Sequence, residues 1–351
     1  MLKSIRSSSD LQIYLTQKGL SWSECQLPDS TAVGYFPLRI PLYYADLINW
    51  KDPADPLRRM VIPDVAEQHV QPYELVDPIG DKAREAVPGL IHRYPDRCLL
   101  LLTTYCAVHC RFCFRREVVG KVRAVDFESI VQYLKEHQEV KEIILSGGDP
   151  FSFPVGFLKS LSEYLTPLDH IRTWRFHTRI PAVDPSSVKG EWLTELAVMG
   201  VSKRLIIVLH VDHPTEVTLE FTDLIKQLHS IGCVLLSQTV LLKGVNDSAE
   251  VLGKLFRSLI EAGVKPYYLH HLDQVVGTDH FRISIDAGKR IYTSLRGNIS
   301  GICNPEYVLD LPGGFGKVPV MWMKKIRDRV YSTTTFDGQT LEYVDQASEA
   351  N

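Results

Sequence analysis

Short apolar runs recur along the middle of the chain at intervals that predict alternating strands and helices. The runs begin near residues 98, 143, 174, 205, 234 and 267, so about 30 residues separate successive starts. One strand–helix unit requires this spacing. Between the runs, the stretch from Phe127 to Leu134 places apolar residues at i, i+3, i+4 and i+7, which predicts an amphipathic helix. Two more helices are predicted over 219–231 and 249–262, each ending at a glycine.

Near-continuous apolar strands that alternate with helices indicate a parallel sheet covered on both faces. We therefore predict an α/β fold in which six units form an incomplete, TIM-like (β/α)6 barrel over residues 97–296. A doubly wound open sheet is the competing topology. Residues 1–96 hold many prolines and only short helical patterns, which predicts a helical and extended N-terminal region. The helix–strand rhythm ends after residue 297, so residues 297–351 are expected to form a C-terminal extension.

The composition narrows the class of protein. The chain has 351 residues, of which 45% are hydrophobic and 23% are charged, as in ordinary soluble proteins. A net charge of −3 gives no global attraction to nucleic acid or to anionic lipid. No apolar run is long enough for a membrane-spanning helix, and the N-terminus lacks the apolar core of a secretory signal. Seven unevenly spread cysteines predict a reducing cytoplasm rather than a disulfide scaffold.

Three of these cysteines, Cys106, Cys110 and Cys113, directly follow the first predicted strand. Thiolates in this C-x3-C-x2-C spacing can hold three irons of a [4Fe–4S] cluster and leave the fourth iron open to a small molecule. Zinc is the alternative, but a structural zinc ion needs four protein ligands. His109 is near, yet it stands awkwardly between two cysteines. Incidental core cysteines, or a non-catalytic iron–sulfur or zinc module that binds a protein partner, remain as further alternatives.

The triad resembles the signature of the radical S-adenosylmethionine (SAM) enzymes. The rest of the chain resembles the lysine 2,3-aminomutase family, including the branch that makes β-lysine for elongation factor P. The similar stretches run from about residue 37 to 322 and include LSGGDP, KPYYLHHLD and YVLDLPGGFGKVPV. The resemblance implies an isomerase that converts L-lysine to β-lysine by moving its amino group from C2 to C3. It implies three cofactors: the cluster, SAM on the open iron as the source of a 5′-deoxyadenosyl radical, and pyridoxal 5′-phosphate.

The resemblance also implies where pyridoxal phosphate binds. Lys317 stands in the glycine-rich stretch LPGGFGK and matches the family's pyridoxal lysine, which forms a Schiff base with the aldehyde. Family members often have glycine where this chain has Phe315. Arg93, Tyr94 and Arg97 match the stretch that helps to bind the cofactor, with arginine at its phosphate. From the residues alone, a solvated lysine in a glycine-rich loop is the alternative.

Three residues are implied to recognise the substrate. Arg115 matches the arginine that pairs with the amino-acid carboxylate, whereas Arg116 beside it is expected to be a solvated or structural charge. Asp273 and Asp310 match the two aspartates that hold the ε-ammonium group of lysine. A buried cation needs such carboxylates, because an unpaired buried charge is costly. The pair of aspartates argues against glutamate as the substrate but leaves ornithine open.

SAM is implied to bind near residues at strand ends. The expected residues are Gly147, Gly148, Asp149, His210 and Gln238, with Thr178 and Arg179 as weaker candidates. One argument for this site is independent of the family. Six special residues fall at or just past the ends of six different predicted strands, and in a parallel barrel these ends form one face, where active sites occur. They are Cys106, Gly147, Thr178, His210, Gln238 and Asp273.

The resemblance bears on partners as well. It implies an amino-acid substrate and an electron donor such as a flavodoxin or ferredoxin, and a homo-oligomer is left open. Long lysine 2,3-aminomutases carry a C-terminal arm whose cysteines bind zinc and join subunits. No cysteine follows Cys303 here, so we expect no such zinc site. The shorter tail favours the elongation factor P branch, whereas Asp310 and the glycine-rich motif favour the metabolic enzyme.

Overall fold

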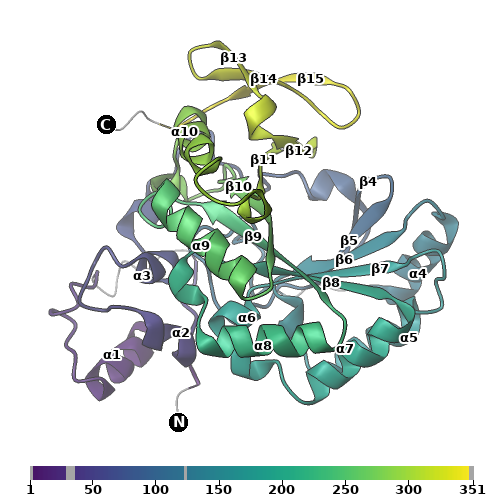
Figure 1. The fold of residues 1–351 in the computed structure, drawn as a ribbon, viewed down its shortest axis with the longest axis horizontal. Helices are drawn as coiled ribbons and strands as arrows, with labels where there is room; N and C mark the ends of the chain where they lie inside the picture. The colour runs from purple at the N-terminus through teal and green to yellow at the C-terminus, as the bar shows by residue number, and fades with distance from the viewer. Residues whose placement is uncertain (1–2, 29–35, 122–124, 348–351) are drawn as a thin grey trace.

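A curved ten-stranded sheet forms the centre of the computed structural model, which describes residues 3–28, 36–121 and 125–347 (Figure 1). Seven neighbouring strands are parallel. These are β5 (Arg97–Thr103), β6 (Glu142–Gly147), β7 (Thr173–Thr178), β8 (Arg204–His210), β9 (Val234–Leu241), β10 (Lys265–His271) and β11 (Glu306–Leu311). The first six are the predicted strands, and the α/β fold with a mostly parallel sheet is confirmed.

The seventh parallel strand differs from the prediction that the helix–strand rhythm ends after residue 297. Helix α10 (Ile285–Leu295) is followed by β11, in which Glu306 lies opposite Tyr268 of β10. The sequence between Pro305 and the glycine-rich loop contains a short apolar run, but the flanking proline and glycines predict an irregular segment, because these residues usually mark loops. The parallel sheet thus continues into residues 297–351, and the three-part division of the chain stays a prediction.

The helices lie along the outer side of the strands (Figure 1). The three helices that the sequence predicted are α4 (Phe127–Glu136), α8 (Leu219–Ser230) and α9 (Ala249–Glu261). Each begins where a side-chain oxygen accepts a backbone N–H of the first turn, from Asp126, Thr218 or Ser248 respectively. The others are α5 (Val155–Leu165), α6 (Ile180–Val183) and α7 (Glu191–Ser202).

Side chains alternate between the helices and the interior of the barrel along the strands. In β9, Leu236 and Gln238 are partly exposed, whereas their neighbours Leu235, Ser237 and Thr239 are buried. Because successive side chains of a strand point to opposite faces, the partly exposed positions face the lumen and the buried ones face the helices. Polar residues on the lumen side can therefore reach a molecule bound inside.

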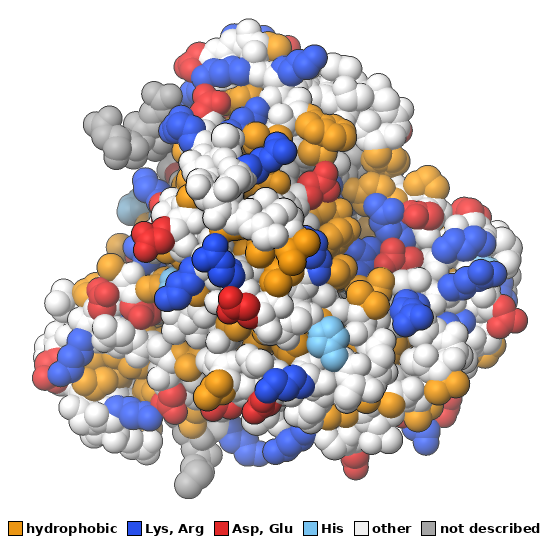
Figure 2. Space-filling view, viewed as in Figure 1, with side chains coloured by type: hydrophobic (Ala, Val, Ile, Leu, Met, Phe, Trp, Pro, Cys, Tyr) orange, Lys and Arg blue, Asp and Glu red, His pale blue; other side chains and the backbone are white. Residues whose placement is uncertain are grey.

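The two edges of the sheet approach each other without pairing in the part of the chain that the structure describes. One edge consists of β4 (Leu90–Tyr94) and β3 (Glu85–Val87), and the other is β12 (Gly316–Pro319). The hydroxyl of Tyr94 on β4 accepts the Lys317 N–H of β12 at 2.9 Å, so the sheet curls until its edges meet at this seam. In the space-filling view the surface is hollowed between the region of β12 and that of β4 and β5 (Figure 2).

The terminal regions flank this sheet. The N-terminal region contains α1 (Ser8–Gln17), α2 (Leu42–Leu47), α3 (Pro56–Val61) and the strand pair β1 (Ser4–Ile5) and β2 (Ile40–Pro41). At the other end, β13 (Lys324–Arg327), β14 (Val330–Thr334) and β15 (Thr340–Val344) form a separate three-stranded sheet. Among the described residues, no helix is both long enough and apolar enough to span a bilayer.

Candidate active site

The three clustered cysteines lie on the loop that follows β5. The Cys113 N–H donates to the Cys110 carbonyl oxygen at 3.1 Å, which makes a tight turn between these two residues. The Arg111 N–H donates to the Met60 carbonyl oxygen at 2.8 Å and so ties the loop to the N-terminal region. Cys106, Cys110 and Cys113 are free and only partly exposed. The loop therefore presents three sulfur ligands at one end of the sheet.

Burial dominates the electrostatics of these three thiols. Burial raises the pKa of all three, to about 12 for Cys110, and the charge of Cys113 raises the pKa of both other thiols further. Within residues 3–28, 36–121 and 125–347, no three His, Cys, Asp or Glu side chains converge as a single metal ion would require. In a [4Fe–4S] cluster each thiolate binds a different iron. The three sulfurs need not converge on one point to serve as ligands of such a cluster.

Arg179 brings a buried positive charge to the cysteine loop. Its Nη1 donates to Cys110 Sγ at 2.9 Å, and its guanidinium also pairs with Asp212 at 3.1 Å and Glu216 at 2.7 Å. Both carboxylates are fully buried. Hydrogen bonds to ligand sulfurs are one means by which proteins tune iron–sulfur clusters. The geometry thus places Arg179, a weaker candidate for SAM contact, directly against a predicted cluster ligand.

The glycine pair after β6 packs against the start of the cysteine loop. A Cβ added to Gly147 would lie 2.2 Å from the Thr103 carbonyl oxygen, and one added to Gly148 would lie 2.1 Å from the Tyr105 carbonyl oxygen. Neither position has room for a side chain. The Gly148 N–H donates to the Thr103 carbonyl oxygen at 2.5 Å. The glycines thus have a packing role, and their predicted contact with SAM stays a prediction.

Asp149 is buried, and its carboxylate is occupied by protein groups. Its Oδ1 accepts the Thr178 hydroxyl at 2.7 Å, and its Oδ2 accepts the Arg179 N–H at 2.7 Å and the Ile180 N–H at 3.2 Å. Burial nevertheless leaves the pKa of Asp149 above its ordinary value. The side chain ties the end of β6 to the end of β7. Its predicted role in binding SAM is untested by these contacts.

His210 and Gln238 lie opposite each other on β8 and β9. Both are partly exposed, as lumen residues are. The His210 Nε2 lies 2.9 Å from Asp212 Oδ2, and its ring meets Phe112 edge-on with centroids 5.7 Å apart. Because Phe112 belongs to the cysteine loop, His210 packs against that loop.

Lys317 and Asp310 face each other across a hairpin. Strand β12 pairs antiparallel with β11, and the register puts Lys317 directly opposite Asp310. The Lys317 Nζ lies 2.9 Å from Asp310 Oδ1 and 2.8 Å from Oδ2. Burial alone would lower the pKa of Lys317, but the charge of Asp310 raises it overall. Burial would likewise raise the pKa of Asp310, but Lys317, His270 and Arg93 lower it overall.

The other predicted pyridoxal residues approach this hairpin from β4 and the start of β5. Tyr94 binds the Lys317 backbone, as described above, and Arg93 Nη1 lies 3.9 Å from Asp310 Oδ1. Arg97 is further out: its guanidinium carbon lies 4.0 Å from the Tyr94 ring centroid, and it pairs with the exposed Asp96 at 2.7 Å. The structure thus brings Arg93 and Tyr94 to Lys317, while Arg97 packs on the outer side of Tyr94.

The predicted substrate residues lie near the same hairpin. Burial, followed by the charge of Asp310, raises the pKa of Asp273 to about 8, while Lys317, Arg282 and Arg115 act in the opposite direction. The two aspartates are therefore close enough to repel each other. Arg115 pairs with Asp81 at 2.7 Å and reaches the Ser146 hydroxyl at 3.4 Å. One end of the lumen thus collects two carboxylates and the other candidate groups for an amino acid.

Arg116 has a structural role, and the alternative of a solvated charge is wrong. Its side chain is 4% exposed and pairs with Glu67 at 2.5 Å. Glu67 also pairs with Arg111 at 2.5 Å, and Arg111 is itself 1% exposed. One carboxylate thereby neutralises two buried guanidinium groups that flank the third cysteine.

We expect Glu67→Gln to destabilise the fold, because it leaves two buried guanidinium groups without a counter-charge. Removing one partner of a buried ion pair costs about 3–5 kcal/mol of unfolding free energy. Denaturant unfolding followed by circular dichroism measures the loss. The control is Asp223→Asn, which removes an exposed ion pair with Lys226 and should change the unfolding free energy by less than about 1 kcal/mol. Equal effects of the two substitutions would contradict this prediction.

Two site residues escaped the sequence analysis. His270 Nδ1 lies 3.8 Å from Asp310 Oδ2, and burial, together with the charge of Lys317, lowers the pKa of His270 to about 3. It is a neutral group beside the hairpin, and the alternation along β10 could have assigned it to the lumen. Asp81, which binds Arg93 and Arg115, lies in a loop of the N-terminal region. No periodic pattern marks it.

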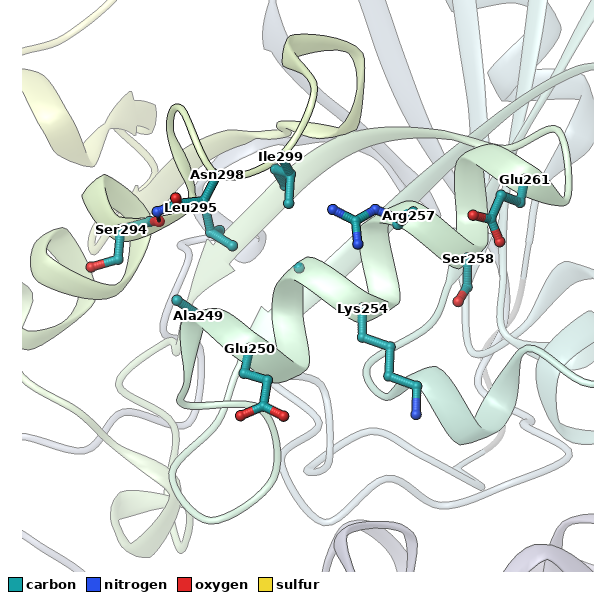
Figure 3. Close-up of a pocket in the computed structure, with 11 residues that line it drawn as sticks. Ala249, Glu250, Lys254, Arg257, Ser258, Glu261, Ser294, Leu295, Asn298 and Ile299 are labelled. Atoms are coloured by element: carbon teal, nitrogen blue, oxygen red, sulfur yellow. Dashed lines mark hydrogen bonds between the residues drawn. The ribbon is translucent and has the colours of Figure 1, made fainter.

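A surface hollow of about 600 Å³ lies away from these residues, between α9 and α10 (Figure 3). Its lining includes the charged side chains of Glu250, Lys254 and Arg257 from the outer face of α9. Of the residues that line it, none belongs to the predicted site. The chemistry-bearing groups are gathered in the lumen and at its seam instead.

Comparisons with known proteins show the family of the chain. The chain matches the radical SAM superfamily over residues 100–255. It is 39% identical to the "Putative L-lysine 2,3-aminomutase" of Aquifex aeolicus (strain VF5), with 88% of this chain and 85% of the relative covered. It is 36% identical to the L-lysine 2,3-aminomutase of Escherichia coli (strain K12), covering 84% and 86%. It is 37% identical to the L-lysine 2,3-aminomutase of Acetoanaerobium sticklandii, with 81% of this chain and 69% of the relative covered. The chain therefore belongs to the lysine 2,3-aminomutase family of radical SAM enzymes, which are isomerases.

Proposed function

We propose that this protein converts L-lysine to β-lysine by 2,3-amino migration. The observation that carries the proposal is the ion pair of Asp310 with Lys317 on the hairpin, where the charge of Asp310 also raises the pKa of Asp273. The charge of Asp310 raises the pKa of Asp273, so a cation bound beside both carboxyl groups would be favourable, and the ε-ammonium group of a diamino acid supplies one. Glutamate would bring a further carboxylate to this point instead of a cation, so we expect it to be rejected.

The remaining groups suit the other parts of the substrate and the cofactors. The Cys106, Cys110 and Cys113 sulfurs would hold the iron–sulfur cluster, which with SAM supplies the radical that removes a hydrogen atom; pyridoxal phosphate supplies an aldehyde and an electron-accepting ring. Lys317 provides the amine for that aldehyde, and the guanidinium of Arg93 suits its phosphate. Arg115 suits the carboxylate of an amino acid.

The protein's own contribution is orientation. Binding of the substrate and cofactors inside the barrel would fix their distance and limit the access of water to reactive species. His210 and Gln238 stand at the cysteine end of this space, and Asp310 and Lys317 stand at the seam. The one electron per activation would come from a flavodoxin or ferredoxin. Free lysine and an elongation factor P pathway require the same reaction, so both remain compatible with this site.

Anaerobic reconstitution tests the proposal. The protein is loaded with iron, sulfide and pyridoxal phosphate, and is then given SAM, dithionite and L-lysine, L-ornithine or L-glutamate at equal concentration. We expect β-lysine as the main product and no β-glutamate. Cys110→Ser should abolish turnover, whereas Cys233→Ala, which removes a buried thiol outside the site, should retain it. Absence of any β-amino acid from the verified holoenzyme would reject the proposal, and preference for ornithine would change its substrate.

A further inference from the structure

The segment from Asp77 to Arg84 crosses the seam of the barrel and touches the loop that precedes Lys317. A Cβ added to Gly80 would lie 2.4 Å from the Gly314 nitrogen and 2.7 Å from the Gly313 carbonyl carbon. Arg84 Nε donates to the Gly314 carbonyl oxygen at 3.3 Å. The contact is thus backbone against backbone, and it fixes the glycine-rich loop relative to the N-terminal side of the seam.

Asp81, in the same segment, joins two of the candidate anion-binding residues. Its Oδ1 lies 3.0 Å from Arg93 Nη2, and its Oδ2 lies 2.7 Å from Arg115 Nη2 and 3.0 Å from Arg115 Nε. The three side chains are only 9–13% exposed. One carboxylate therefore orients the arginine assigned to the cofactor phosphate and the arginine assigned to the substrate carboxylate.

Asp81 is itself held in place by its surroundings. The Asp81 N–H donates to Asp77 Oδ1 at 2.9 Å, and the Lys82 N–H donates to Asp77 Oδ2 at 3.0 Å. Arg93 Nη2 also donates to the Ile79 carbonyl oxygen at 2.8 Å, so Arg93 is bound by two groups of this segment, the Ile79 carbonyl and the Asp81 carboxylate. A carboxylate fixed in this way is suited to orient other side chains, because little conformational entropy is lost in ordering it when a ligand binds.

We propose that Asp81 is a positioning residue that orients Arg93 and Arg115 together, so that the phosphate of the cofactor and the carboxylate of the amino acid are bound at a fixed separation. The inference rests on the proposed function and adds a residue to it. A purely electrostatic role predicts the opposite behaviour. Removing a negative charge without loss of orientation would strengthen the binding of both anions. Loss of orientation weakens binding, because a misaligned guanidinium no longer offers paired donors.

The substitution Asp81→Asn separates these two roles. We expect the KM for L-lysine to rise about tenfold or more, with kcat within about twofold, because the interaction serves ground state and transition state alike. The apparent Kd for pyridoxal phosphate should rise as well, which an absorbance titration of the protein without SAM or reductant measures independently of turnover. L-lysinamide, which lacks the carboxylate, should lose much less affinity than L-lysine. An unchanged or lowered KM and Kd would overturn the inference.

A second variant keeps the test decisive if Asp81→Asn does not fold. Asp81→Glu retains the charge but displaces it by one methylene group, so the positioning role predicts weaker binding of both anions, and a charge-only role predicts wild-type values. Asp223→Asn is the matched control on the exposed face of α8. Failure of the wild-type protein to bind pyridoxal phosphate or L-lysine would reject the proposed function. Wild-type binding by a folded Asp81→Glu variant would reject only the role of Asp81.

Discussion

Replacement of Lys317 by alanine should abolish β-lysine formation, with a fall in kcat of at least about 10⁴-fold, as expected when a covalent group is removed. Lys317 lies on β12 of the β11–β12 hairpin, and its Nζ is 2.8 Å from Asp310. The visible absorbance band of the imine between this amine and pyridoxal phosphate should disappear with it. Iron content should not change, because the cysteines lie on the loop after β5 and not on the hairpin.

Borohydride gives a direct readout that does not depend on activity. Reduction of the imine fixes the cofactor covalently, and peptide mapping of the wild-type protein should place it on Lys317 alone. Lys254→Ala is the control, because Lys254 lies on the outer face of α9 (Figure 3) and should neither carry the label nor affect turnover. Label on another lysine, or an unchanged absorbance band in Lys317→Ala, would contradict the assignment.

The second large effect is expected at the carboxylate pair. Asp310→Asn removes the partner that the proposal gives to the ε-ammonium group of lysine. Truncation of one partner of a buried charge pair costs about 2–5 kcal/mol, so kcat/KM should fall roughly 30- to 5,000-fold. In the free protein the Lys317 amine pairs with the Asp310 carboxylate. The amine of the protein and the ε-ammonium group of the substrate are therefore alternative partners for this carboxylate. L-norleucine, which lacks the ε-amine, should bind equally poorly to both proteins.

The same pair predicts a pH dependence. The pKa of Asp273 is raised to about 8, so in the free protein this carboxyl group keeps its proton at neutral pH. An ammonium group favours the ionised form, so lysine binding releases that proton. The kcat/KM for lysine should therefore rise about tenfold per pH unit as the pH approaches 8 and level off above it.

Asp273→Asn isolates this effect from other ionisations. The α-amino group of lysine also titrates in the alkaline range, but it affects both proteins equally. The ratio of wild-type to variant kcat/KM, measured from pH 6 to about pH 9, should carry the step near pH 8. A ratio that is independent of pH would show that Asp273 does not ionise on binding lysine.

Much of the barrel could be predicted because its signals are local. Strand and helix positions follow from apolar periodicity, and Asp126, Thr218 and Ser248 mark helix starts by their chemistry. Strand β11 was missed because proline and glycine flank it, and only its pairing with β10 reveals a strand. The strand-end argument placed His210 beside the cysteine loop, since it depends only on parallel direction.

The sequence proposed the residues of the candidate site but not the connections between them. The resemblance supplied Arg93, Arg115, Asp310 and Lys317, and the structure shows how they interact. Asp81 could not be found, because its role depends on a contact between distant segments across the seam. Arg116 could not be assigned either, since its burial depends on Glu67 from another part of the chain. Contacts made only by tertiary packing leave no trace in local periodicity.

The antiparallel register of β11 and β12 has a consequence for how such a chain can diversify. Insertion or deletion of one residue in the turn before Gly316 would send the lysine amine and the aspartate carboxylate to opposite sides of the ribbon. The ion pair would then be broken, with only Asp310 left on its present side. The need to keep Lys317 opposite Asp310 therefore fixes the length of this turn. Acceptance of shorter or longer diamino acids would have to evolve through substitutions on β10 and in the loop that follows it.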